Sequence, residues 1–493
     1  MAYGAPVARR RQIRSKYSYP SQKSIQGCAR LLLLLGIAGA ALLTGCGGSS
    51  ASSTGQGTSG TGGTGSSGGT GSGGTSTAQA NSISVQFSSG GGAIPVAVAT
   101  QVGSGAWTAT TLQNGQFTIS VPSGTQNYAY AYVCAPYVSQ SNGTVTTNET
   151  NEYIYEQSVQ DGTSVTVPSG CFVIPSTPPA SEETAVTLNV DATAIPNTTF
   201  IGISSTLGAG SISGTSGTAP MNVLSGTSNF IVEAMDNSFD PLAVAILRSQ
   251  TIPGQLNGGN PVVLSAANAT TSTTVTYQNI PNGWGSPYLF ANFFTSDGVG
   301  LIVTPLQFSS GDMYYAIPTS QVQSGDYYSF SLVINSAPTT PLNTYSAVGS
   351  IINTPATSAP TSFAFPAPLP ASDAAPTAAA LPTFNVAYPG FSDTSLTSTG
   401  VYGSIQWPTY VSNNPPQSIY SLVVNATSTY LNGATTLTVP NLATVPGFIS
   451  APSSGTGVSW YAGAYGESYP IVSPAPTTSK YSYALLVGTY TTP

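Results

Sequence analysis

Residues 128–134 read Tyr-Ala-Tyr-Ala-Tyr-Val-Cys, and this alternation of large and small side chains decides the fold class. Successive side chains of a β-strand point to opposite faces, so the three tyrosines and Cys134 share one face. The same period recurs at Ile83, Val85 and Phe87, at Phe117, Ile119 and Val121, and at Val186, Leu188 and Val190. Gly, Pro and Asn separate these segments, a pattern typical of an antiparallel β-sandwich.

The composition supports the same interpretation. Charged residues make up only 5% of the chain, against about a quarter in ordinary soluble domains. Glycine, proline and tyrosine are abundant instead, with 54, 38 and 27 copies. Such a mixture favours short strands joined by many turns and is poor in helix-forming residues. We therefore expect an all-β protein.

The chain divides by composition into a signal, a linker and two to three antiparallel β-sandwich domains. The expected parts are a signal peptide over 1–45, a lipidated cysteine with a flexible Gly/Ser/Thr linker over 46–81, β-sandwich 1 over 82–195, β-sandwich 2 over 196–336, a connector rich in Pro, Ala, Ser and Thr over 337–380, and a β-rich third domain over 381–493. Within the second sandwich, the apolar run 242–248 fits a short helix and a buried strand equally well.

The N-terminus has the features of an export signal. A basic stretch ends at Arg30, and an apolar run follows over 31–43. This run is shorter than the roughly 20 residues that a membrane-spanning helix needs, and small residues follow it, as in a secretory signal peptide.

The residues Leu43, Thr44, Gly45 and Cys46 resemble the lipobox of bacterial lipoproteins. The resemblance implies cleavage before Cys46 and attachment of a lipid to its sulfur, which would anchor the chain to a membrane. It also implies a location in the cell envelope, and at the outer rather than the inner membrane of a cell with two membranes, because Gly47 and not Asp follows the cysteine.

A longer stretch resembles uncharacterised bacterial surface lipoproteins with an Ig-like or prealbumin-like β-sandwich. The resemblance rests on Gly105-Ala-Trp107, on Gly115-Gln-Phe117-Thr-Ile119 and on the aromatic strand that ends at Cys134. It covers about a quarter of the chain and implies a fold more than a function, since sandwiches serve many roles.

The charge of the exported part excludes one class of partner. Beyond Cys46 the chain has two basic residues, Arg248 and Lys480, against sixteen Asp and Glu, which gives a net charge of −14. Nucleic acid is excluded because phosphate binding requires a basic surface. When the carboxylates are protonated, only two positive charges remain, so we expect little self-repulsion and hence tolerance of acid.

The absence of histidine limits the possible chemistry. Ser-His-Asp and Cys-His arrangements cannot form, and zinc sites lose their most common ligand. We therefore predict no cofactor and no catalytic residue. Cys134 and Cys171 are the remaining cysteines after Cys46, and in an oxidising compartment they favour a disulfide; the alternative is two buried free thiols.

Two further groups are weak candidate sites. Asp236, Asn237 and Asp240 offer oxygen ligands for calcium, but the loop has too few of them, and a turn stabilised by its own side chains is the favoured interpretation. Trp460, Tyr461 and Tyr465 could form a ligand-binding aromatic platform, but packing in the core or on the sheet is the favoured interpretation of such tyrosine-rich strands.

These observations favour a membrane-anchored surface or periplasmic lipoprotein with a non-catalytic role in adhesion, envelope structure or assembly. The alternative is a carbohydrate-binding or carbohydrate-processing surface module. The expected partners are the lipid bilayer, through acylated Cys46, and an envelope protein or a glycan.

Overall fold

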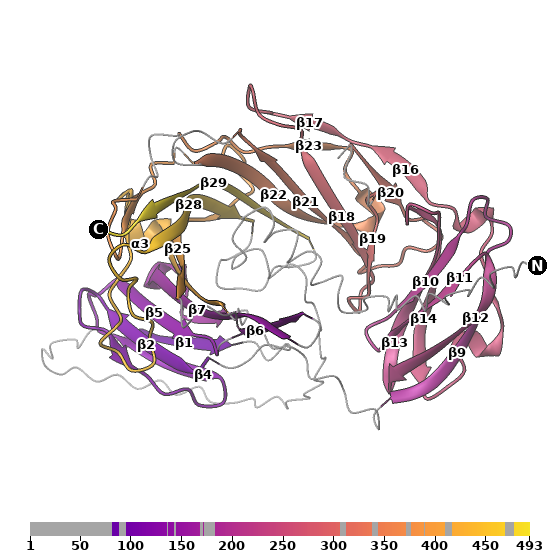
Figure 1. Cartoon of the computed structure of the whole chain (residues 1–493), viewed down its shortest axis with the longest axis horizontal. Coiled ribbons are helices and arrows are strands. Elements are labelled where there is room, and N and C mark those ends of the chain that lie inside the picture. The colour runs from indigo at the N-terminus through magenta and orange to yellow at the C-terminus, as the bar shows by residue number, and fades with distance from the viewer. Residues whose placement is uncertain are drawn as a thin grey trace, which may run out of the picture.

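The chain forms an all-β structure, as the alternating pattern predicted. The computed structural model describes residues 81–87, 95–135, 137–141, 144–167, 171, 183–305, 312–337, 344–370, 376–388, 390–409, 417–468 and 478–493. Two β-sandwiches lie at opposite ends of a long curved sheet that connects them (Figure 1). No helix within these ranges is long and apolar enough to cross a membrane.

The first sandwich has a small three-stranded sheet on its outer side. β1 (Asn81–Phe87) lies between β4 (Gln116–Val121), which is antiparallel to it, and β8 (Ser164–Val167), which is parallel to it. In β1 and β4 every second side chain is buried. These buried side chains pack against the tyrosines of the 128–134 segment, so the predicted shared face is confirmed.

A single thirteen-stranded sheet crosses the whole molecule. Its strands, in spatial order, are β19 (Gly300–Ile302), β18 (Tyr288–Phe294), β21 (Tyr327–Asn335), β22 (Tyr345–Pro355), β29 (Ser479–Thr491), β28 (Gly457–Glu467), β25 (Ser398–Thr409), β26 (Gln417–Thr427), β7 (Thr144–Ser158), β5 (Asn127–Val133), β2 (Ala97–Val102) and β3 (Thr108–Ala109), with β6 (Tyr137–Ser141) paired to β7. The parallel pair of β26 and β7 joins the C-terminal strands to the first sandwich.

The second sandwich consists of two smaller sheets around a core of their own. One sheet has the order β11 (Ala209–Ser213), β10 (Phe200–Ser204), β13 (Gly226–Met235) and β14 (Pro241–Ile252). The other has the order β12 (Ser216–Leu224), β9 (Glu183–Asp191) and β15 (Val262–Val263). The ambiguous run 242–248 is therefore a strand, and it is buried because β14 also faces the core of the long sheet.

Short elements complete the described chain. The paired strands are β16 (Thr271–Thr274) with β20 (Met313–Ala316), β17 (Thr276–Gln278) with β23 (Ser362–Ala364), and β24 (Thr383–Asn385) with β27 (Thr436–Thr438). The helical turns are η2 (Val159–Asp161), η4 (Leu256–Gly259), η5 (Ala266–Asn268), η6 (Ala356–Ser358) and α3 (Ser428–Leu431).

The strand pairing differs from the predicted domain limits in three places. β9 falls within the expected first sandwich, 82–195, but pairs with β12 of the second. β22 occupies part of the expected connector, 337–380, yet it is a long strand between β21 and β29. β26 of the expected third domain, 381–493, pairs with β7. Four pairings among the described strands are also parallel, where only antiparallel ones were expected.

A polar junction holds the second sandwich against the long sheet. Arg248 on β14 forms two hydrogen bonds to the carboxylate of Asp326, with N–O distances of 3.0 and 2.6 Å. The Asp326 side chain is fully buried, and it also accepts hydrogen bonds from the backbone of Ser296 and Gln323. Nearby, Asp297 accepts hydrogen bonds from the backbone N–H and side chain of Asn229. The junction therefore depends on buried charge as well as on apolar packing.

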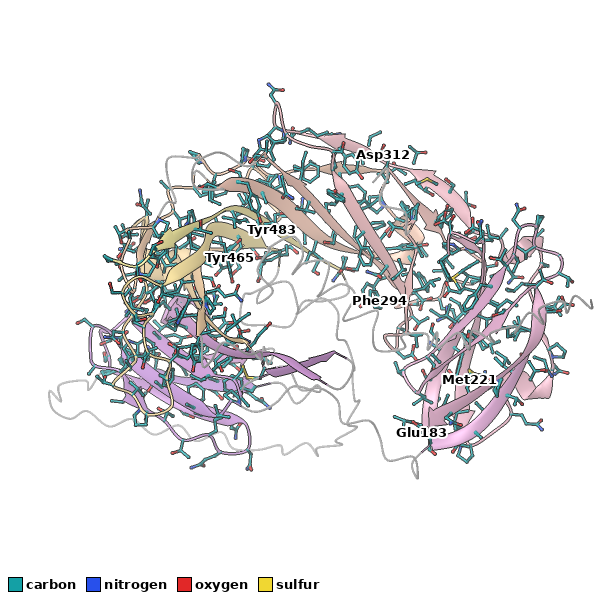
Figure 2. The ribbon with its side chains drawn as sticks, viewed as in Figure 1. Glu183, Met221, Phe294, Asp312, Tyr465 and Tyr483 are labelled. Carbon is teal, nitrogen blue, oxygen red and sulfur yellow. A yellow bond between two sulfur atoms is a disulfide. The ribbon has the colours of Figure 1, made fainter. Side chains whose placement is uncertain are left out.

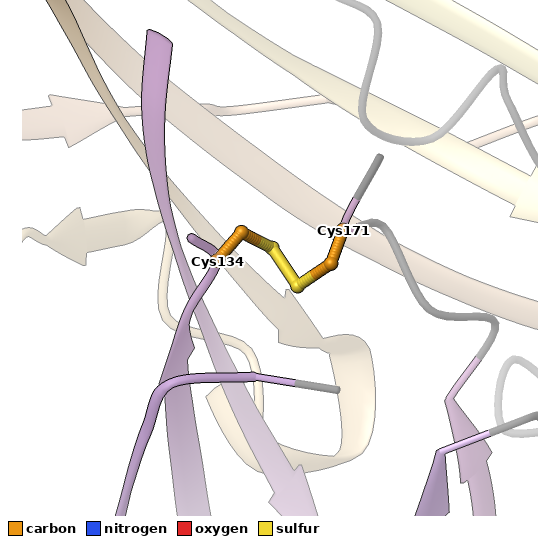
Figure 3. The surroundings of a disulfide bond; sticks show 2 residues. All are labelled: Cys134 and Cys171. Carbon is orange, nitrogen blue, oxygen red and sulfur yellow. A yellow bond between two sulfur atoms is a disulfide. The ribbon is translucent and has the colours of Figure 1, made fainter. Parts of the chain in front are cut away.

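A disulfide bond joins Cys134 to Cys171, which confirms the predicted pair (Figure 3). Both cysteines are buried, and they are separated by 37 positions in the sequence. The bond ties the end of β5 to the segment that follows β8. A loop of this length stabilises the folded state by about 3–4 kcal/mol in the chain-entropy description.

We expect the double variant Cys134→Ala/Cys171→Ala to lose about 3–4 kcal/mol of unfolding free energy, because its unfolded chain regains the entropy of the open loop. Urea unfolding with and without a reductant measures this loss. The reductant should destabilise the natural protein by a similar amount and leave the double variant unchanged. An equal response of both proteins to the reductant would contradict the prediction.

Candidate functional site

A groove of about 970 Å³ lies where the N-terminal and C-terminal parts of the long sheet meet. Its floor is the surface of β5, β7, β26 and β25, and its wall is the segment 447–457, which we call the strap. The lining residues are Val96, Val133, Cys134, Thr150, Trp407, Pro408, Tyr420 and the strap itself. The groove is thus built from three stretches that are far apart in the sequence.

The floor has aromatic side chains on β25 and β26 and a small side chain on β7. Trp407 on β25 lies directly opposite Tyr420 on β26, with their ring centroids 5.8 Å apart. Tyr420 in turn lies opposite Thr150 on β7. Since residues directly opposite across neighbouring strands share a face, the sheet register itself sets this row of side chains.

Close packing and one buried hydrogen bond fix the strap over the floor. Gly447 has a φ of +89°, and a Cβ at this position would lie 2.8 Å from the Cβ of Ala97 on β2. Only glycine suits both the left-handed backbone and the close approach. Two residues further on, the backbone N–H of Ile449 donates to Oε2 of Glu152, at 3.0 Å.

Glu152 is a fully buried carboxyl group beneath the strap. Burial raises its pKa to about 7, although the hydrogen bond from Ile449 acts in the opposite direction. Its other oxygen, Oε1, has no hydrogen-bond partner among the described residues. Thr150 lies two positions earlier on the same strand and Val133 lies directly opposite, so Glu152 points to the side of the sheet that carries the groove.

The remaining lining combines apolar surface with hydroxyl and backbone groups. Phe448 and Ile449 supply apolar atoms, and the strap also presents the hydroxyls of Ser450, Ser453, Ser454 and Thr456. No charged side chain is among the described residues that line the groove. Trp407 is only 3% exposed and belongs to the core, so the aromatic surface open to the groove comes from the partly buried Tyr420 and Phe448.

The structure places Trp460 and Tyr465 within the sheet, each only 4% exposed, in agreement with the favoured packing interpretation and not with the alternative of an aromatic platform. Trp460 packs against Gly488 of the neighbouring strand, where no other side chain would fit beside the indole. Tyr465 lies across Gly400 on β25 in the same way. Tyr461, between them in the sequence, is partly buried against a cluster that contains Tyr465 and Tyr483. Figure 2 shows Tyr465 and Tyr483 on the adjoining strands β28 and β29, within the sheet.

The weak calcium candidate at Asp236, Asn237 and Asp240 forms a turn. Oδ1 of Asp236 accepts hydrogen bonds from the backbone N–H groups of Ser238 and Asp240, at 2.8 and 3.0 Å. Oδ2 of Asp240 accepts a hydrogen bond from Tyr315, at 3.2 Å. Among the residues that the structure describes, no three His, Cys, Asp or Glu side chains lie close enough to hold a metal ion.

The remaining predicted site, Cys46 with Leu43, Thr44 and Gly45, lies outside the described residues. The groove, in contrast, was absent from the sequence prediction. Trp407 and Tyr420 each belong to an ordinary alternating strand, and the strap reads as a Pro/Gly/Ser loop. Only the parallel pairing of β26 with β7 brings the three stretches together.

No protein-family model and no curated protein matches the chain. The assignment of a role therefore rests on the chemistry of these residues.

Proposed function

We propose that this chain is an exported lipoprotein, anchored to an envelope membrane through acylated Cys46, whose β-structure has a non-catalytic role in adhesion, envelope structure or assembly. The observation that carries the proposal is the buried Cys134–Cys171 disulfide in a chain that begins with a basic, then apolar, then Leu-Thr-Gly-Cys sequence. Structural disulfides belong to oxidising compartments outside the cytosol. The disulfide and the N-terminal sequence therefore support export independently.

The architecture suits a mechanical or binding role. One hydrogen-bonded sheet runs from the first sandwich to the edge of the second. Along this path the described strands are joined by hydrogen bonds and not by loops alone. The chain has no histidine for the usual hydrolytic arrangements. A second candidate function, carbohydrate binding, is favoured by one observation, a groove lined by the partly buried Tyr420 and Phe448 and by the hydroxyls of the strap.

We expect Cys46→Ala to release the protein from the membrane, because without the thiol no lipid can be attached. Cys28→Ala is the matched control, since Cys28 precedes the proposed cleavage site and should not be needed. Expression in a bacterial host, followed by membrane fractionation and metabolic labelling with a fatty acid, measures both effects. Fatty-acid labelling and membrane retention of Cys46→Ala would refute the anchoring.

A further inference from the structure

We propose that the outer edge of β4 pairs with the β4 edge of a second copy of this chain, so that two first sandwiches share one continuous sheet. β4 is the last strand of the small sheet that it forms with β1 and β8, and it lies at the outer margin of the first sandwich (Figure 1). The inference goes beyond the proposed role and does not require the lipid anchor.

Two residues of β4 have backbone groups without a partner among the described residues. The N–H of Phe87 donates to the carbonyl of Gly115, at 2.9 Å, and this bond fixes which residues of the antiparallel pair bond to each other. The odd-numbered residues of β4 therefore bond to β1, whereas the N–H and C=O groups of Thr118 and Ser120 point away from it. Both residues are exposed, and no hydrogen bond to these groups is formed within the described ranges. Such an open edge is a template for pairing with another strand.

The open stretch has defined ends. At one end, Gln116 exchanges two backbone hydrogen bonds with Gln113, at 3.1 and 2.9 Å, so its N–H and C=O are both occupied. At the other end, Pro122 has no N–H, and its carbonyl accepts a hydrogen bond from the N–H of Thr125. A pairing strand can therefore form hydrogen bonds only with the two outward-facing residues between these ends.

Other strands at sheet edges carry the protections that natural β-proteins use against such pairing. β3 and β19, at the two ends of the long sheet, have only two and three residues. β9 has an acid at each end, Glu183 and Asp191, and β12 contains Pro220. On the outer edge of β14, the N–H of Ile246 donates to the side chain of Gln321. In contrast, β4 has no charge, proline or bulge over its six residues.

A second copy of β4 fits this edge. When two β4 strands run antiparallel about a two-fold axis at Ile119, Thr118 of each copy lies opposite Ser120 of the other. Residues opposed in this way exchange two hydrogen bonds, so every free backbone group on both edges finds a partner. A shift of the antiparallel register by two residues would leave one of the two residues on each strand unpaired. The edge is therefore self-complementary in length and register.

The side chains of a second copy also suit the pairing. On the buried face, Ile119 lies opposite its own copy and Phe117 lies opposite Val121, and cross-strand pairs of β-branched and aromatic residues stabilise sheets. An acidic chain repels its own copies, so contact between them requires a surface without carboxylates. Neither β4 nor its neighbour β1 contains an acid. A charged segment of another protein would not continue the apolar face.

The contact is small, which decides how it is measured. Stable interfaces bury about 1,200–2,000 Å², and two paired strands of six residues bury less than that. We therefore expect a reversible dimer, which a covalent trap captures better than a measurement of size alone.

The test is a cysteine trap on the purified full-length protein in detergent, with oxidised glutathione as the oxidant. In the double variant Thr118→Cys/Ser120→Cys, each cysteine lies opposite one of the second copy, at a Cα distance of about 5.5 Å that a disulfide can bridge. In each single variant the two cysteines lie diagonally, about 7–8 Å apart, which is too far. We expect a covalent dimer of the double variant on non-reducing gels and at least about tenfold less from each single variant.

Ser164→Cys/Thr166→Cys is the matched control, on the opposite edge of the same sheet. β8 has only four residues and follows the turn η2, which carries Asp161, so we expect no covalent dimer from this variant. The natural protein measures the background from its other cysteines. All variants should unfold at the temperature of the natural protein, because none of the four positions is buried.

Absence of a covalent dimer from Thr118→Cys/Ser120→Cys would overturn the proposal. Equal yields from the single variants, or from the β8 variant, would overturn it too, because they would show collision without the stated register. The lipid anchor is measured separately, by fractionation of Cys46→Ala. Failure of the pairing and failure of the anchoring therefore give different results.

Discussion

The protein should unfold at a higher temperature at pH 4.5 than at pH 8, by about 5–10 °C, because it buries carboxyl groups that have no counter-charge. Burial raises the pKa of Glu233 and of Glu467 to about 8, and that of Glu156 to about 7. Burial also raises the pKa of Glu152, to about 7. These groups lie in both sandwiches and in the long sheet, so the effect should be global.

The direction follows from proton linkage. Between pH 4.5 and pH 8 an unfolded glutamate is ionised, whereas the buried one keeps its proton, so the folded state binds more protons. Stability therefore falls as the pH rises through this window. A pKa unit corresponds to about 1.4 kcal/mol, so Glu233 and Glu467 can each account for up to about 4 kcal/mol. Carboxyls with a lowered pKa, such as Asp393 at about 2, stabilise the protein in their ionised form. The protein loses this contribution only in stronger acid, where they are protonated.

Thermal unfolding followed by circular dichroism across this pH range is the measurement. Glu233→Gln and Glu467→Gln should each raise the unfolding temperature at pH 8 and flatten the pH dependence, since glutamine has a similar shape and no charge. Glu183→Gln, at the partly exposed start of β9, is the matched control and should leave the slope unchanged. An unfolding temperature far lower at pH 4.5 than at pH 8 would refute the prediction.

Arg248→Met should destabilise the protein by about 3–5 kcal/mol, because it leaves the buried carboxylate of Asp326 without its cation. The arginine side chain is only 17% exposed, and its guanidinium also donates to the backbone oxygen of Gln321. The contact lies between the second sandwich and the long sheet. The junction between them should therefore loosen first, which limited proteolysis would detect.

Lys480→Met is the matched control. Lys480 and Asp393 form a similar ion pair at 2.5 Å, but their side chains are 24% and 34% exposed. Exposed pairs contribute about 0–1 kcal/mol, so this variant should unfold almost as the natural protein does. The double variant Arg248→Met/Asp326→Asn should recover part of the loss, because it removes both buried charges and keeps a side-chain oxygen for the backbone N–H groups of Ser296 and Gln323. Equal losses in Arg248→Met and Lys480→Met would contradict the argument.

The groove and the buried carboxyls share a physical origin. A chain with 5% charged residues has few cations to pair with its carboxylates. Several acids are consequently enclosed by strands without a counter-charge, and burial favours their protonated form. We therefore expect the folded state to be more stable in mild acid than at pH 8.

Local sequence patterns were sufficient to predict most strands and to favour the disulfide. Alternation with a period of two is a local property, so it was sufficient to place Tyr128, Tyr130 and Tyr132 on one buried face. The two cysteines beyond Cys46 left one possible pair in that part of the chain. The acidic imbalance was also visible without a structure.

Which faces are covered and which strands pair depends on tertiary contacts that no local pattern indicates. Alternation assigns side chains to two faces but does not say what lies on either, so the sequence left a platform open as the alternative for Trp460 and Tyr465, which are packed over glycines. Likewise, no local signal indicates that β26 pairs with β7, or that β22 lies in the middle of the sheet. Strand pairing depends on contacts between residues hundreds of positions apart, and the groove exists because of those contacts.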